Sequence, residues 1–159
     1  MNYYLLEQIA QVGEDEGIAE FSLEIPLKSH LFWKGNYIVY ICKQDSVEER
    51  RIVSIMPDEK LVLSEYLFHY LQLYIPLTAS SLFQHEIPLP TLSIQKTIIQ
   101  HLQNSWKLTQ AIEQLMEQFR YSSVFPRNTV YQHLRQQLQQ AQLMQHQLQQ
   151  TILHGGVIY

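Results

Sequence analysis

Cysteine and long apolar runs are the two features that this sequence most clearly lacks. Its single cysteine, Cys42, excludes a disulfide framework and a cysteine-based zinc site; we interpret it as a small core residue, with a reactive thiol as the alternative. The longest apolar runs, such as YIVYI, are far too short to span a bilayer. The first residues, MNYYLLEQ, lack the basic segment and cleavage site of a signal peptide. We therefore expect a cytoplasmic protein without membrane partners.

An excess of positive charge is also missing. Charged residues make up 16% of the chain, and 11 lysines and arginines against 15 acidic residues give a formal net charge of −4 at pH 7. Nucleic-acid-binding domains are usually basic. The acidic run GEDEG at 13–17 carries negative charge, which is unfavourable for binding DNA. Any DNA contact made by this chain must therefore depend on a few scattered cations.

Motifs that carry catalysis are missing as well. The seven histidines are scattered, and none forms a metal-spaced set with acidic residues or cysteine. The sequence has no G-x-S-x-G, no P-loop and no glycine-rich nucleotide loop. We interpret His69 as a half-buried structural residue. The sequence thus predicts a protein that is not an enzyme and holds no metal or cofactor.

The composition changes near residue 90. Residues 1–90 carry most of the aromatic and β-branched residues, and the segments 36–42, 50–56 and 18–25 read as strands. Residues 64–74 predict a helix with Ser64 as N-cap, because Leu67, Tyr70, Leu71 and Tyr74 recur on one face. The fold class expected for this half is α+β, as a small mixed domain.

Residues 91–159 predict a long antiparallel helical pair, a coiled-coil spacer with helices at about 93–120 and 129–153. Thr129 and Gln132 form a candidate capping box, and Gly155-Gly156 a C-terminal stop. Gln145 lies on the seam and could fix the register. The seam residues, which alternate in steps of three and four, are Ile98, Leu102, Ser105, Thr109, Ile112, Met116 and Phe119, then Tyr131, Leu134, Leu138, Ala141, Gln145, Leu148 and Ile152.

A single helical pair leaves apolar flanks in need of a partner, so we expect self-association, most simply as a homodimer, or docking on another protein. The candidate interface residues are Trp106, Leu143, Met144, Ile112, Phe119 and Leu148.

Two prolines stand where the two halves meet. Pro88 and Pro90 fix their own φ angles and favour extended geometry in the residues before them. The stretch IPLP at 87–90 should therefore be a short, straight strut directly ahead of the first long helix. Such a strut would set the angle between the halves.

This strut and helix resemble the specificity subunits of type I restriction–modification systems, in which a target-recognition domain ends in an I-P-L-P-P-L stretch before a long helix. The matching residues here are Ile87, Pro88, Leu89, Pro90, Leu92, Gln95, Lys96, Ile98 and Leu102, with Thr91 in place of a proline and Ser93 and Ile94 in place of an acidic pair. Upstream, GNYIVYI and the run at 50–71 are similar to the family's strand and helix motifs. Downstream, LQQTILHGGV is similar to its closing motif.

The resemblance implies a globular domain that reads DNA and helices that act as a ruler and carry adenine methyltransferase subunits, with a translocase as a further partner. One domain and one helical region look like a half-subunit, which would pair two-fold to read a symmetric, interrupted site. A protein–protein adaptor that keeps the fold but has lost DNA reading is the alternative. The candidate DNA contacts, chosen for charge and neighbouring aromatics, are Lys34, Arg50, Arg51, Lys43, Lys28 and Trp33.

Overall fold

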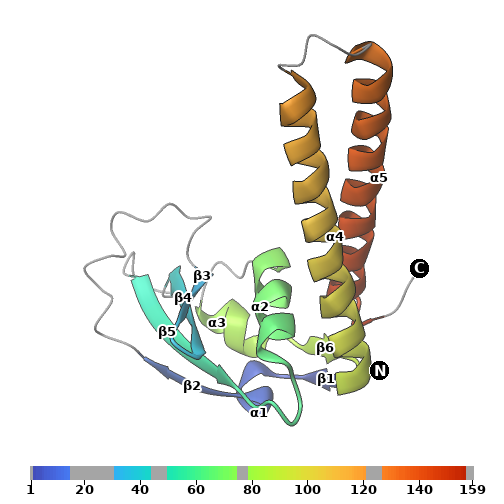
Figure 1. Ribbon diagram of the computed structural model, residues 1–159. Helices are drawn as coiled ribbons and strands as arrows, with labels where there is room; N and C mark the ends of the chain where they lie inside the picture. The colour runs from blue at the N-terminus through green and yellow to red at the C-terminus, as the bar shows by residue number, and fades with distance from the viewer. Residues whose placement is uncertain (1, 15–30, 44–49, 75–78, 121–126, 157–159) are drawn as a thin grey trace.

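The computed structural model describes residues 2–14, 31–43, 50–74, 79–120 and 127–156. A globular head is built from the strands and short helices up to residue 89, and two long antiparallel helices project from it as a stalk (Figure 1). The α+β fold with a long helical pair, expected from the sequence, is confirmed.

A four-stranded antiparallel sheet forms the larger layer of the head, in the order β2-β5-β4-β3. Its strands are β2 (Ala10–Glu14), β3 (Leu31–Lys34), β4 (Tyr37–Lys43) and β5 (Arg50–Pro57). Strands β4 and β5 confirm the segments expected at 36–42 and 50–56 to within one residue at each end. The strand expected at 18–25 lies outside the described residues.

The middle of β4 is buried on both faces, which explains why this strand reads as a continuous apolar run rather than as an alternating one. Side chains alternate across a strand, so Ile38 and Tyr40 enter the main core of the head, whereas Val39 and Ile41 join Ile52 in a second cluster. The sheet is therefore a central layer with apolar contacts on each side.

Helix α2 (Ser64–Leu73) packs between the sheet and the stalk, and it contacts β3, β5, α4 and α5 (Figure 1). Two short helices, α1 (Leu6–Ile9) and α3 (Ala79–Gln84), complete the head. The helix expected at 64–74 is confirmed, but Ser64 is not its N-cap. Leu63 takes that position, and the Ser64 hydroxyl, one residue inside the helix, donates a hydrogen bond to Glu59.

The proline strut is a strand. Strand β6 (Ile87–Leu89) pairs antiparallel with β1 (Asn2–Tyr4), and Pro88 stands opposite Tyr3. Proline is tolerated here because a two-stranded ribbon has only edge strands. The extended geometry predicted for the strut is thus present, with a pairing partner from the start of the chain.

The stalk consists of α4 (Leu92–Arg120) and α5 (Arg127–Leu153), close to the expected 93–120 and 129–153. Ile112, Leu134 and Ala141 are buried between the helices, with Met116, Val130 and Leu138 packed around them. Two details differ from expectation. Helix α5 begins at Arg127, so Thr129 lies inside the first turn and is not the N-cap, and Tyr131 is 39% exposed instead of buried in the seam.

Helix α5 ends on the expected glycine pair. Gly155 and Gly156 have φ of 69° and 85°, a region that other residues rarely adopt. The Gly156 N–H donates to the Thr151 carbonyl at 2.8 Å and the Gly155 N–H to Ile152 at 3.2 Å, the two bonds of a Schellman motif. A Cβ on Gly156 would lie 3.0 Å from the Pro90 ring, so the turn that ends α5 packs directly against the strut.

One apolar core runs from the head into the base of the stalk. It contains head residues such as Leu6 and Tyr66 and also Ile98, Leu102 and Ile152 from the two long helices. The boundary expected at residue 90 therefore falls within a continuous core.

Candidate functional site

Gln95, on the first turns of α4, joins the head to the stalk. Its side chain is 0% exposed and has three hydrogen bonds to backbone groups. Its Oε1 accepts from the Leu63 N–H at 2.9 Å, and its Nε2 donates to the carbonyls of Leu61 at 3.1 Å and Pro90 at 2.9 Å. One glutamine thus satisfies polar groups of the loop before α2 and of the strut.

These bonds restrict the angle between the two parts. Leu61 and Leu63 belong to the head, Pro90 follows strand β6, and Gln95 is part of α4. A rotation of α4 relative to the head would break several of these bonds, and Gln95, which is itself buried, would lose its partners. The joint is therefore held by directional bonds as well as by the apolar core.

A group of polar side chains interrupts the apolar seam of the stalk about halfway along α4. Gln145 Nε2 donates to the Thr109 hydroxyl at 2.6 Å and to the Ser105 carbonyl at 3.2 Å. The Thr109 hydroxyl in turn donates to the Ser105 carbonyl at 2.9 Å. Because a shift of one helix along the other would separate these groups, Gln145 specifies the register, the role that its seam position predicts.

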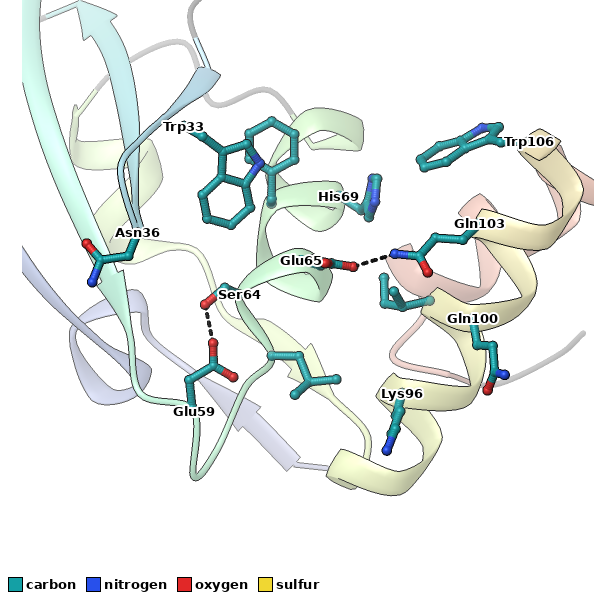
Figure 2. A pocket seen from close by; sticks show the side chains of 13 residues that line it. Trp33, Asn36, Glu59, Ser64, Glu65, His69, Lys96, Gln100, Gln103 and Trp106 are labelled. Atoms are coloured by element: carbon teal, nitrogen blue, oxygen red, sulfur yellow. Dashed lines mark hydrogen bonds between the residues drawn. The ribbon is translucent and has the colours of Figure 1, made fainter. Parts of the chain in front are cut away.

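A cleft of about 1080 Å³ opens between the head and the stalk. Its walls come from the β3–β4 turn, from the loop before α2, from α2 itself and from the first half of α4 (Figure 2). A cavity of this size can take several side chains of another molecule. Two other hollows lined by described residues are smaller, about 300 Å³ at strand β2 and about 610 Å³ beside the strut.

A row of aromatic rings lines this cleft. Trp33 from β3 stacks on Phe68 from α2, with ring centroids 5.0 Å apart and planes 19° apart. His69 follows Phe68 in the chain and lies 5.0 Å from Trp106 of α4. The aromatic row therefore links the sheet, α2 and the stalk along one wall, and Trp33 remains 40% exposed.

Charged and amide groups share the cleft with the rings. Glu59, Glu65 and Lys96 are all exposed, and Figure 2 shows Glu65 beneath His69. Gln103 Nε2 of α4 donates to Glu65 Oε2 of α2 at 2.8 Å. A carboxylate has about four lone-pair positions, so Glu65 keeps the capacity to accept from a ligand. The cleft carries two carboxylates against one ammonium group.

Burial lowers the pKa of His69 below its ordinary 6.5, against the raising effects of its hydrogen bond with Gln72 and of the nearby Glu65. The unfolded chain therefore binds more protons than the folded chain between this lowered pKa and about pH 6.5. The stability that neutral His69 contributes is fully present above that window and is lost as the pH falls through it.

We accordingly expect thermal melts of the His69→Gln variant to depend less on pH between 7 and 5 than melts of the unchanged chain. The exposed His146 of α5 provides a matched control, since His146→Gln should keep the full dependence. Equal pH slopes for both variants would contradict the role given to His69.

A second aromatic cluster lies on the other side of α2 and escaped the sequence analysis. The His85 ring stacks on Tyr74 at 3.8 Å, and its Nε2 lies 2.5 Å from the Tyr70 hydroxyl. Burial raises the pKa of Tyr70 to about 12 and lowers that of His85. The pair therefore stays neutral near pH 7, which suits a packing role beside strand β6.

The candidate DNA contacts do not gather in one place. Lys34 pairs with Tyr37 at one end of β4, whereas Arg50 pairs with Lys43 at the other end. A strand of seven residues spans about 20 Å. The sequence places Lys34 next to Trp33, yet alternation along β3 directs their side chains to opposite faces of the sheet.

The other candidates divide further. The Arg51 guanidinium lies over the Phe83 ring, 5.3 Å from its centroid, so this residue packs against α3. The side chains of Lys43 and Arg50, and all of Lys28, lie outside the described residues.

The candidate interface residues also divide. Leu143 and Met144 are exposed at 57% and 50%, as the interface interpretation requires. Trp106 and Leu148 instead pack on the core shared by the head and the base of the stalk, and Ile112 is buried inside the stalk. The side chain of Phe119 lies outside the described residues. Two exposed leucines of α4, Leu108 and Leu115, were not among the interface candidates, although their seven-residue spacing marks one helical face.

Within the described ranges, no group of three or more histidine, cysteine or acidic residues is placed to hold a metal ion. None of the helices in these ranges combines the length and the apolarity needed to cross a membrane. Comparison with protein-family models found no match for this chain, and searches of curated proteins and of solved structures found none either.

Proposed function

We propose that this chain is a non-catalytic DNA-recognition half-subunit of a type I-like restriction–modification complex in the cytoplasm. In this proposal the head reads DNA, and the stalk positions an adenine methyltransferase and, with it, a translocase. The observation that carries the proposal is the joint, where the paired proline strand and the buried Gln95 hold the head at a fixed angle to the stalk.

A fixed angle matters most for a protein that must present a surface at a defined distance. Helix α4 has 29 residues and is therefore about 43 Å long. This length exceeds one turn of DNA, about 34–36 Å. Two heads separated by such stalks could reach two half-sites on one face of a duplex, provided that neither joint bends.

A second copy supplies the second head. Isologous pairing places identical surfaces around a two-fold axis, and a two-fold pair of readers matches a symmetric, interrupted site. The exposed Leu143 and Met144 lie on the stalk, where such a pairing would leave both heads free.

The proposal is tested by DNA binding of the purified chain, alone and co-purified with any adenine methyltransferase that is encoded beside its gene. The variant Lys43→Glu/Arg50→Glu reverses the charge at two paired positions of β4 and β5, so the two positions still carry charges of the same sign. We expect weaker binding to all sequences and a salt dependence with a slope smaller by about two, since each phosphate contact contributes about one.

The control is Lys107→Glu/Arg135→Glu, which reverses the same two residue types at exposed positions of the stalk. This control should bind DNA as the unchanged complex does. Equal losses in both variants would show that the head is not the reading surface.

A protein–protein adaptor is the second candidate, and the placement of the cations favours it. Lys34 is separated from Lys43 and Arg50 by the length of β4, and the chain has a formal net charge of −4. An adaptor would retain the methyltransferase partner and give no DNA binding at low salt, where phosphate contacts are strongest.

A further inference from the structure

We propose that the cleft between the head and the stalk binds a basic side chain, preferably an arginine, presented by a segment of a partner protein. This inference goes beyond the proposed function, because it assigns a peptide site to a cleft that includes neither the cations tested above, Lys43 and Arg50, nor the exposed Leu143 and Met144 of the stalk. It depends on three features of the cleft: its shape, its aromatic wall and its charge.

The shape suits a side chain that enters from outside. The cleft of about 1080 Å³ is open, and its walls belong to the head on one side and to α4 on the other. Gln103 and Glu65 form a hydrogen bond across it at 2.8 Å, which holds the two walls together in the absence of a ligand (Figure 2). The site is therefore already formed.

The aromatic wall offers faces to a cation. Trp33 and Trp106 both line the cleft, and Trp33 is 40% exposed although it stacks on Phe68. Tryptophan is the best aromatic partner for a cation, and arginine is the cation found most often over such rings. The planar guanidinium can stack on an indole while its N–H groups reach a carboxylate.

The charge of the cleft favours the same occupant. Glu59 and Glu65 are exposed carboxylates that accept hydrogen bonds only from Ser64 and Gln103 among the described residues, whereas Lys96 is the one lysine or arginine that lines the cleft there. A nucleic acid would bring phosphates towards two carboxylates, which is unfavourable. A guanidinium would balance them, and a carboxylate can accept it in a two-bond arrangement.

The two tryptophans of the chain make a direct assay possible. Both line the cleft, so both indole N–H signals in an amide-correlation NMR spectrum report on it. The probe is a nine-residue Gly/Ser peptide with one central arginine, and its control carries citrulline, a neutral isostere, at that position. We expect the arginine peptide to shift both indole signals and the citrulline peptide to shift neither at equal concentration.

The variant Glu59→Gln/Glu65→Gln removes the charge and keeps an oxygen that can accept from Ser64 and Gln103. We expect it to weaken arginine-peptide binding by at least about fivefold. The matched control, Glu7→Gln/Glu113→Gln, makes the same change at two exposed positions outside the cleft and should bind as the unchanged chain does. The cleft variant should also bind DNA normally with its methyltransferase, which separates this inference from the proposed function.

Three outcomes would overturn the inference. Equal shifts with citrulline would mean that charge has no role, and equal binding by the cleft variant would place the peptide elsewhere. If a twelve-nucleotide single-stranded DNA shifts the indole signals and the arginine peptide does not, the aromatic wall is a base-stacking surface instead.

Discussion

Replacing Gln95 with leucine is expected to lower the free energy of unfolding by about 3 kcal/mol or more. The Leu63 N–H and the carbonyls of Leu61 and Pro90 would remain near an apolar side chain without their present partner. A buried polar group left unsatisfied costs about 1–3 kcal/mol. Since 1 kcal/mol shifts the melting temperature of a chain of this size by about 2–4 °C, the melting temperature of the variant should be lower by about 6–12 °C.

The control is Gln100→Leu, the same substitution at an exposed position of the same helix. It should change stability by no more than about 0.5 kcal/mol, because surface substitutions away from special features have small effects. Calorimetry of both variants makes the comparison. If the Gln95→Leu variant has the same melting temperature as the Gln100→Leu variant, the apolar core alone holds the joint.

The joint shows how far sequence reasoning reaches. Pro88 and Pro90 predict an extended segment because proline restricts its own backbone and the preceding residue, and β6 is extended. Its partner β1 could not be foreseen, since Asn2–Tyr4 is three residues long and lies more than eighty residues away in the chain. The hydrogen bonds of Gln95 across the joint were not predicted either. Gln95 stands in a matching motif, but only the fold brings Leu61 and Leu63 to it.

The stalk was predictable in its pattern and less so at its ends. Steps of three and four place Ile112, Leu134 and Ala141 on facing stripes, and these residues are buried together. Tyr131 obeys the same steps and is exposed, because burial at the far end depends on how the two helices overlap and not on the pattern of either one. The pairing of Gln145 with Thr109 depends on the same overlap.

The cleft could not be predicted from the sequence. Trp33, His69 and Trp106 come from three distant segments, and an isolated aromatic residue does not indicate whether it lies in a core or a cleft. One error had a local cause. Lys34 and Trp33 looked like one surface because they are neighbours, but once 31–34 is recognised as a strand, alternation separates them.

Leu134→Ala is expected to destabilise the stalk by about 2–5 kcal/mol, the usual cost of truncating a buried leucine. Leu134 is 7% exposed and packs with Ile112 and Ala141 between the helices. The sequence pattern gives Leu138 equal weight, but Leu138 is only partly buried, so its truncation should cost less. Helicity followed by circular dichroism during a thermal melt measures the order of the two effects.

Leu143→Ala makes the same substitution nine residues further along α5, where the side chain is 57% exposed. Its free energy of unfolding should lie within about 0.5 kcal/mol of that of the unchanged chain. Its dimer should instead dissociate at a higher protein concentration, so that the mass measured in solution falls earlier on dilution. If two linked heads bind one DNA, loss of the dimer should weaken DNA binding more than any single contact would, because the second head then no longer binds at a high effective concentration. If the Leu143→Ala chain keeps its mass and its DNA affinity, this face of the stalk is not the interface. If the Leu134→Ala chain has an unchanged melting temperature, the buried seam is not the source of the stalk's stability.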